Sequence, residues 1–164
     1  MWLSVLWMGL AHAVTPGPLA GTWTYAGGDS ERAAVDAVRN DVAKRFNALF
    51  RGIVRNRLAK PMTVDEQIVI SGDEQNVSIQ LKGDYPRESK GLSDGVTRKT
   101  QDDQISYSHL LETNTLTFIG ENEEGGRKTI YKLVNDNTLE MHNTLWSPRM
   151  GEPITWTLTY EKSQ

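Results

Sequence analysis

A histidine on the inward face of a predicted β-strand is the side chain best placed to do chemistry in this sequence. His109 alternates with Tyr107 and Leu111 along the strand predicted over residues 105–112, with serines on the other face. An enclosed imidazole could hydrogen-bond a ligand or coordinate a haem iron. The alternative is a hydrogen-bonded core histidine, in which case we expect no cofactor.

Other catalytic and metal-binding patterns are weak. His12 lies in a leader segment and His142 points to the outer face of its strand, so no second histidine converges on His109. No Asp or Glu has metal-ligand spacing from His109, and the chain has no cysteine, which argues against a zinc site. No serine is placed to complete a Ser-His-Asp set, and no carboxylate pair shares an inward face. No catalytic residue is therefore assigned.

Aromatic and polar side chains could instead line a pocket. A few polar groups among aromatic walls are typical of sites for small apolar molecules. The predicted ligand-binding residues are Tyr107, His109, Tyr131, Asn143, Trp156, Tyr160, Phe46 and Phe50. The alternative is a filled core, because barrels of about eight strands can be packed solid.

Short strands must position most of these residues. From residue 67 onward apolar and polar side chains alternate, which predicts strands joined by short turns. The predicted strands cover residues 22–26, 67–71, 76–82, 96–100, 105–112, 115–121, 127–134, 138–146 and 154–161. The polar residues 83–95 are predicted to form a loop or a poor edge strand. The fold class is mainly β, an up-and-down antiparallel β-barrel of about eight to ten strands with a helical lid inserted after the first strand.

The alternation also assigns an inward face to each late strand. On the last strand Trp156 and Leu158 point inward, whereas Thr157 points outward. The other inward residues are predicted to be Ile105, Tyr107, His109, Leu111, Thr129, Tyr131, Leu133, Leu139, Met141, Asn143, Leu145, Ile154 and Tyr160.

A helical block separates the first strand from the rest. Apolar residues recur at three- and four-residue steps over residues 30–58, within an insertion that spans residues 29–59. A single helix of that length would run about 43 Å, longer than a small barrel is wide. A break near Asn47 or Gly52 is therefore predicted. The side chains expected to pack toward the barrel are Val38, Val42, Phe46 and Phe50.

The composition fits one folded domain, predicted over residues 21–164 of the 164-residue chain. The net charge of −3 gives no indication of a nucleic-acid partner. Hydrophobic residues make up 38% and charged residues 24%, which is ordinary for a soluble globular protein.

Residues 1–13 are predicted to be a signal peptide. Their apolar run of about ten residues is too short to span a bilayer, and Ala11-His12-Ala13 fits a signal-peptidase site. We expect cleavage after Ala13, an extended segment over residues 14–20, and a secreted or periplasmic protein. No Lys or Arg precedes the apolar run, which departs from the usual signal peptide. The alternative is a buried N-terminal helix.

The sequence Gly21-Thr22-Trp23 on the first strand resembles the short signature of the calycin barrels, which include lipocalins and fatty-acid-binding proteins. The element order is most similar to that of fatty-acid-binding proteins, in which two lid helices follow the first strand and the last strand carries Arg-x-Tyr. Lys60-Pro61 and Thr157-Leu158-Thr159-Tyr160 occupy matching places. The resemblance implies structural roles for Gly21 and Trp23, with Trp23 plugging the closed end of the barrel.

The chain also departs from that family. Leu158 stands where the resemblance would place a carboxylate-binding arginine, so the last strand offers no charged contact to a fatty-acid head group, and only Tyr160 carries over. The predicted signal peptide, residues 1–13, is also not expected in a family of cytosolic proteins. The chain therefore resembles an exported relative.

The function predicted is an exported carrier, a monomer that holds a small hydrophobic or amphipathic, lipid-like ligand inside the barrel. The alternative is a solid-core barrel that acts through its surface as an inhibitor or assembly factor, and the third choice is an enzyme that uses His109. The helical block is rich in Lys and Arg, and Arg51 and Arg55 are predicted to face anionic membranes. A charge run of this kind is otherwise the solvated face of a helix.

Overall fold

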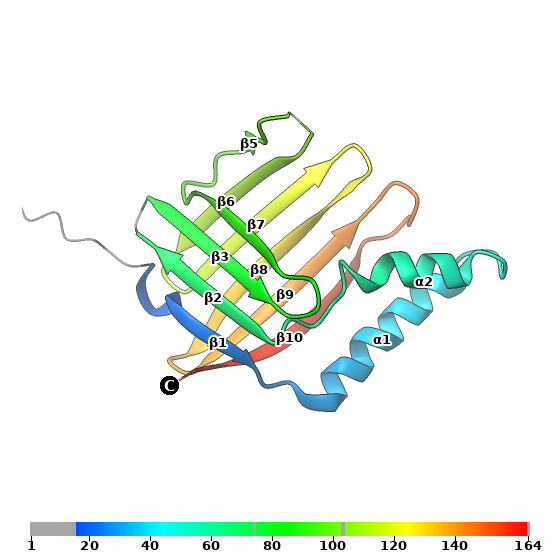
Figure 1. The fold of residues 1–164 in the computed structure, drawn as a ribbon, viewed down its shortest axis with the longest axis horizontal. Coiled ribbons are helices and arrows are strands. Elements are labelled where there is room, and N and C mark those ends of the chain that lie inside the picture. The colour runs from blue at the N-terminus through cyan, green and yellow to red at the C-terminus, as the bar shows by residue number, and fades with distance from the viewer. Residues whose placement is uncertain (1–15, 74, 103, 164) are drawn as a thin grey trace, which may run out of the picture.

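A strongly curled antiparallel sheet forms the body of the molecule in the computed structural model, which describes residues 16–73, 75–102 and 104–163. Figure 1 shows the sheet wrapping around an interior, with both helices lying at one end of it. The strands are β1 (Gly21–Tyr25), β2 (Gln67–Gly72), β3 (Asn76–Lys82), β4 (Arg87–Leu92), β5 (Arg98–Lys99), β6 (Ser106–Glu112), β7 (Thr115–Asn122), β8 (Gly125–Asn135), β9 (Thr138–Trp146) and β10 (Ile154–Lys162). The helices are α1 (Gly28–Lys44) and α2 (Arg51–Ala59).

The strand order confirms the predicted up-and-down barrel architecture. The ten strands run in the order β4-β3-β2-β1-β10-β9-β8-β7-β6-β5, so every pair is sequential except β1 with β10. In that exceptional pair Trp23 lies opposite Lys162, while on its other side Trp23 lies opposite Ile68 of β2. The first and last strands of the domain therefore lie together in the middle of the sheet.

The two ends of the curled sheet meet where β4 approaches β6. After β4 the chain bends, and Asp94 forms an antiparallel bridge with Leu110. The Gly95 amide donates to the His109 carbonyl oxygen at 2.7 Å, and the Leu111 amide donates to the Ser93 carbonyl oxygen at 3.2 Å. We call this junction of β4 and residues 93–95 with β6 the seam.

Residues 83–95 were predicted to form a loop or a poor edge strand, and the structure shows a strand, β4, within them. It pairs with β3 along its whole length, from Arg87 opposite Leu81 to Leu92 opposite Asn76. Strand β5, predicted over residues 96–100, contains only Arg98 and Lys99.

The β2–β3 hairpin shows how local sequence fixes the register. The Asp73 carboxylate accepts hydrogen bonds from the Gln75 and Asn76 amides at 2.9 and 2.7 Å, which is the behaviour of an aspartate in a tight turn. Gly72 has a φ of 133°, and a Cβ there would lie 2.1 Å from the Asn76 carbonyl oxygen. Glycine is therefore required at that position.

The interior follows the predicted alternation on the last three strands. Tyr160, Leu158 and Met141 are fully buried, whereas Thr155 and Thr157 are exposed. Trp23 is also fully buried, and its indole Nε1 donates to the Leu19 carbonyl oxygen at 3.0 Å. Leu19 belongs to a short 3-10 turn, Gly17–Leu19, so the prediction of an extended segment over residues 14–20 is wrong for those three residues.

On β6 the alternation is only partly correct. His109 is buried, but Tyr107 and Leu111 are half-buried, and Ile105 lies outside the strand with 43% of its surface exposed. Ile105 is therefore outside the packed core, but it lines a cavity between the helices and the sheet. Strand β5 pairs with only two residues of β6.

The helical block breaks as predicted. Helix α1 ends at Lys44, and a turn closed by the Phe50 amide donating to the Asn47 carbonyl oxygen leads into α2. Val42 is buried and Phe46 packs against the core, but Phe50 is 54% exposed. The prediction that Phe50 packs toward the barrel is wrong because Phe50 lies in the turn between the helices, where the helical spacing of α1 no longer continues.

Among the described residues, neither helix combines the length and apolarity that a membrane span needs. The predicted signal peptide, residues 1–13, lies outside the described residues. We call α1, α2 and the turn between them the lid.

Candidate ligand site under the lid

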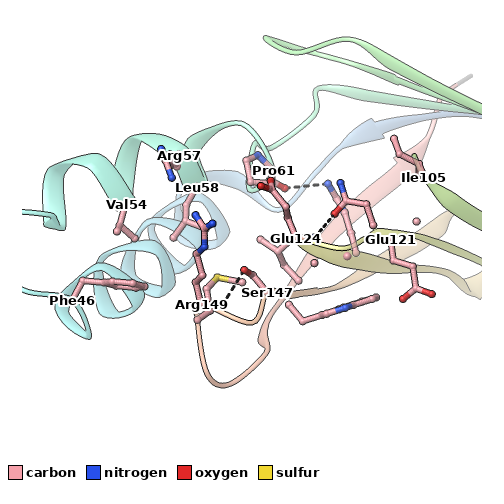
Figure 2. Close-up of a pocket in the computed structure, with 18 residues that line it drawn as sticks. Phe46, Val54, Arg57, Leu58, Pro61, Ile105, Glu121, Glu124, Ser147 and Arg149 are labelled. Carbon is pink, nitrogen blue, oxygen red and sulfur yellow. Dashed lines mark hydrogen bonds between the residues drawn. The ribbon is translucent and has the colours of Figure 1, made fainter. Parts of the chain in front are cut away.

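A cavity of about 530 Å³ lies between the lid and the neighbouring end of the sheet. Figure 2 shows Phe46, Val54 and Leu58 of the lid on one side of it and Glu121 and Glu124, near the β7–β8 turn, on the other. Its remaining apolar wall is formed by Pro61, Ile105, Leu145, Trp146 and Met150. The cavity is therefore mainly apolar, with charged side chains at its rim.

Arg127 on β8 provides a cation in the wall of this cavity. Its Nε donates to Thr129 Oγ1 at 3.0 Å, one terminal nitrogen donates to the Pro61 carbonyl oxygen at 3.0 Å, and the other donates to Asn143 Oδ1 at 2.5 Å. Burial is the main cause that lowers the pKa of Arg127 to about 10, followed by the nearby Arg87 guanidinium. The side chain therefore stays protonated at neutral pH.

A buried ion pair lies next to this cation. The fully buried Asp65 carboxylate accepts from Arg87 on β4 at 2.8 Å through Oδ2, while its Oδ1 has no partner. Burial raises the pKa of Asp65, and the positive charges of Arg87 and Arg127 oppose that effect. The Tyr160 hydroxyl donates to the Asp65 backbone oxygen at 3.0 Å. Two positive side chains, Arg87 and Arg127, therefore lie near the single Asp65 carboxylate.

Trp156 adds an unused donor. Its side chain is 6% exposed, and the indole Nε1 is buried without a hydrogen-bond partner. The Arg127 guanidinium carbon lies 5.5 Å from the centre of the Trp156 ring, within cation–π range. A buried donor without a partner costs about 1–3 kcal/mol, so an acceptor brought to this place would be favoured.

The predicted ligand-binding residues fall into three groups. Tyr131, Asn143, Trp156 and Tyr160 are buried near Arg127 but do not line the cavity, and burial raises the pKa of Tyr131 to about 12. Phe46 lines the cavity, whereas the exposed Phe50 does not.

His109 and Tyr107 belong instead to the seam, with ring centres 5.9 Å apart. His109 Nε2 lies 2.8 Å from Ser89 Oγ of β4, so a serine does approach the histidine, contrary to the sequence-based expectation. The described residues contain no group of three or more His, Cys, Asp or Glu side chains that could hold a metal ion.

The predicted lid cations differ in their surroundings. Arg51 Nε donates to the Phe46 carbonyl oxygen at 3.2 Å, which ties the start of α2 to the turn, and Arg55 is exposed. Exposed apolar side chains lie beside them: Leu49 is 83%, Phe50 54% and Ile53 52% exposed.

Sequence reasoning missed the charged residues Arg127, Arg87 and Asp65. The sequence does indicate an inward Arg127, because this residue stands two positions before Thr129 and therefore shares its inward face. Asp65 and Arg87 carried no comparable signal, since neither lies in an alternating apolar pattern.

No protein-family model matches the chain, and no curated protein matches it significantly. Solved protein structures, in contrast, do match the chain. A Schistosoma mansoni fatty acid binding protein in complex with arachidonic acid matches with a TM-score of 0.53 at 12% identity, covering 90% of this chain and 97% of the other. The fluorescent protein UnaG matches with 0.53 at 12% identity over 88% and 97% of the two chains. Echinococcus granulosus fatty-acid-binding protein 1 gives 0.50 at 13% identity over 90% and 98%.

These matches cover nearly the whole of both chains, and they agree with the observed strand order and with the two helices after β1. Identity of 12–13% carries information about the fold and not about the ligand. The chain therefore has the fold of the fatty-acid-binding proteins and related calycin barrels, which confirms the fold-level resemblance of its sequence.

Proposed function

We propose that this protein is an exported carrier that binds one small amphipathic molecule, with an apolar body and an anionic head group. The proposal rests on Arg127, a protonated side chain in the wall of a mainly apolar cavity. The fold supports the proposal, because solved relatives of the same fold include proteins named for fatty acid binding.

The charge balance favours an anion. Arg87 is matched by Asp65, whereas Arg127 is held by the neutral acceptors of Thr129, Pro61 and Asn143. An arginine has five N–H donors, so Arg127 keeps donors for a carboxylate or similar group. Trp156, whose indole donor has no partner, lies against Arg127 but does not line the cavity.

The apolar body of the ligand would lie toward the lid. Phe46, Val54 and Leu58 offer it an apolar ceiling, and a cavity of about 530 Å³ falls within the usual range for small-molecule sites. Each buried CH₂ group contributes about 0.8 kcal/mol, so a chain of several carbons would supply much of the affinity.

Native mass spectrometry of the protein purified from its own host tests the proposal. We expect a bound small molecule of defined mass that is released on unfolding. In parallel, titration with anionic 1-anilinonaphthalene-8-sulfonate should give tighter binding than the uncharged N-phenyl-1-naphthylamine. An empty protein that binds neither probe would contradict a carrier and favour a surface-acting module.

Export is a separate part of the proposal. It rests on the apolar run and the Ala11-His12-Ala13 site in the sequence. Mass measurement of the protein from the host envelope or medium should give a chain that begins at Val14. A cytosolic protein that keeps Met1 would contradict export and leave the carrier proposal unaffected.

The lid offers a surface for transient contact with an anionic membrane. Leu49, Phe50 and Ile53 project at the turn and on α2, and Arg51 and Arg55 lie among them. Apolar side chains that insert below the head groups, flanked by cations, are the arrangement found in interfacial helices. Contact there would bring the cavity beneath the lid close to the lipid phase.

An Arg51→Glu/Arg55→Glu variant should therefore lose membrane binding. Each basic side chain near an anionic surface contributes about 1 kcal/mol, and that contribution falls with salt. We expect weak sedimentation of the parent with phosphatidylserine-containing vesicles at low salt and none of the variant.

The matched control is Lys90→Glu/Lys132→Glu, which makes the same change in net charge on the sheet away from the lid. It should bind like the parent. Leu49→Ser should weaken binding at both low and physiological salt, because insertion is apolar. Equal binding by all four proteins would show that the lid cations only solvate a helix.

A further inference from the structure

A buried histidine lies at the seam. Two backbone hydrogen bonds join residues 93–95 to β6, and the side chains of Ser89 and His109 meet across the junction at 2.8 Å. His109 is 1% exposed. Gly91 lies so close that a Cβ there would be 2.8 Å from His109 Nδ1. The imidazole thus fills the inner side of the seam.

The surroundings of this imidazole suit its neutral form alone. Nδ1 is buried without a hydrogen-bond partner, and the Phe118 ring packs with its centre 5.1 Å from the imidazole centre. No carboxylate of the described residues forms an ion pair with His109. A buried charge without a partner is strongly unfavourable, so a protonated His109 would have to reach water.

The ionisable groups on the neighbouring elements add to this preference. Strand β4 offers Ser89 and Gly91 to the ring, and its inward Arg87 is bound to Asp65. Strand β7 offers Phe118 and β6 offers Tyr107. Strand β5 brings the Arg98 cation, which is paired with the Asp94 carboxylate of the seam at 2.8 Å. Burial first, and the Arg98 charge second, lower the pKa of His109 below its ordinary 6.5.

We propose that the seam is an acid-opened port, in which protonation of His109 places a charge without a partner in the interior and separates β4 from β6 so that bound ligand is released. This inference rests on the proposed carrier function for its ligand part. The opening itself is a property of the fold and can be measured without a ligand.

The direction of the pH effect follows from linkage. A histidine whose pKa is lowered in the closed state binds protons more readily once the seam is open. The closed state is fully favoured above pH 6.5 and loses stability as the pH falls toward the lowered value. Over that interval the population of the open seam should rise by about tenfold per pH unit.

Two measurements test the port. Stopped-flow dissociation of 1-anilinonaphthalene-8-sulfonate is followed from pH 7.5 to 5.0, and hydrogen exchange of the amides in residues 93–111 is followed over the same range after correction for intrinsic rates. In the parent, both the dissociation rate and the corrected exchange should rise below pH 6.5, by up to about tenfold per pH unit, until the lowered pKa of His109 is reached.

His109→Gln keeps a polar side chain without a titration and should make both readouts flat with pH. Ser89→Asp places a carboxylate beside the ring, so protonation should no longer open the seam and dissociation should stay slow at pH 5.0. The matched control is His142→Gln on the outer face, where His142 pairs with Glu140 at 3.0 Å. It should behave like the parent.

The outcomes separate the port from the carrier. Acid-enhanced exchange at the seam without any probe binding would contradict the carrier and retain the port. Probe binding with a pH-independent seam, or the same acid response in His109→Gln as in the parent, would overturn the port.

Discussion

Trp23→Ala is expected to lower the free energy of unfolding by about 3–5 kcal/mol, the cost of truncating a large buried aromatic residue. Trp23 is fully buried, donates to the Leu19 carbonyl oxygen, and lies in the middle of the sheet between β2 and β10. Urea unfolding followed by circular dichroism measures the change as a fall in the midpoint.

Trp23→Phe separates the two contributions at this position. It keeps an aromatic ring but loses the hydrogen bond to Leu19, and such bonds contribute about 1 kcal/mol. An alanine variant that unfolds with the midpoint of the parent would remove Trp23 from the core and contradict its structural role.

Arg127→Met should weaken binding of an anionic probe by about 10- to 100-fold. Hydrogen bonds to charged groups contribute about 1.5–3 kcal/mol, and about 1.4 kcal/mol corresponds to a factor of ten. The uncharged probe should bind as well as before, or better, because methionine fills similar space without a charge. Fluorescence titration of both probes with parent and variant gives the comparison.

The same substitution carries a cost in stability, since the Asn143, Thr129 and Pro61 oxygens lose their shared donor. Thermal melts must therefore show that the variant is folded at the titration temperature. Arg149→Met is the matched control, because Arg149 also lines the cavity but is exposed at its rim. Equal losses of anion affinity in both variants would show that Arg127 has no special role in recognition.

The pH dependence of that affinity provides an independent check. With a pKa of about 10, Arg127 stays charged throughout the neutral range. Anion binding to the closed protein should therefore be level between pH 7 and 9 and fall only as the pH approaches 10.

The sequence predicted the parts of the fold in which burial and residue type agree. On β10 the inward residues are apolar and the outward ones are threonines, so alternation reveals both the strand and its faces. On β4 the inward positions are Arg87, Ser89 and Gly91, which face Asp65 and His109 rather than an apolar core. A strand with a polar inner face gives no hydrophobic period, and for that reason only a poor edge strand was predicted.

The candidate site was less predictable because its chemistry depends on contacts between distant segments. Asn143 could be assigned inward by alternation, but its partner Arg127 lies 16 residues away and the Pro61 oxygen 66 residues from Arg127. Phe50 was predicted wrongly for a different reason. The helical spacing of α1 was extended through a turn whose position the sequence indicated only approximately, whereas in the structure Phe50 lies in that turn and is exposed.

The pairing of β1 with β10 has a consequence for how the protein is made. Tyr25 lies opposite Tyr160, so the two halves of this contact are separated by most of the chain. During synthesis β1 has one sheet partner missing until the final strand leaves the ribosome, and contacts this distant in sequence are slow to form. A chain stalled before Ile154 would present the edges of β1 and β9 to other molecules, a template for aggregation. Nascent chains should thus expose both edges until β10 has been synthesised.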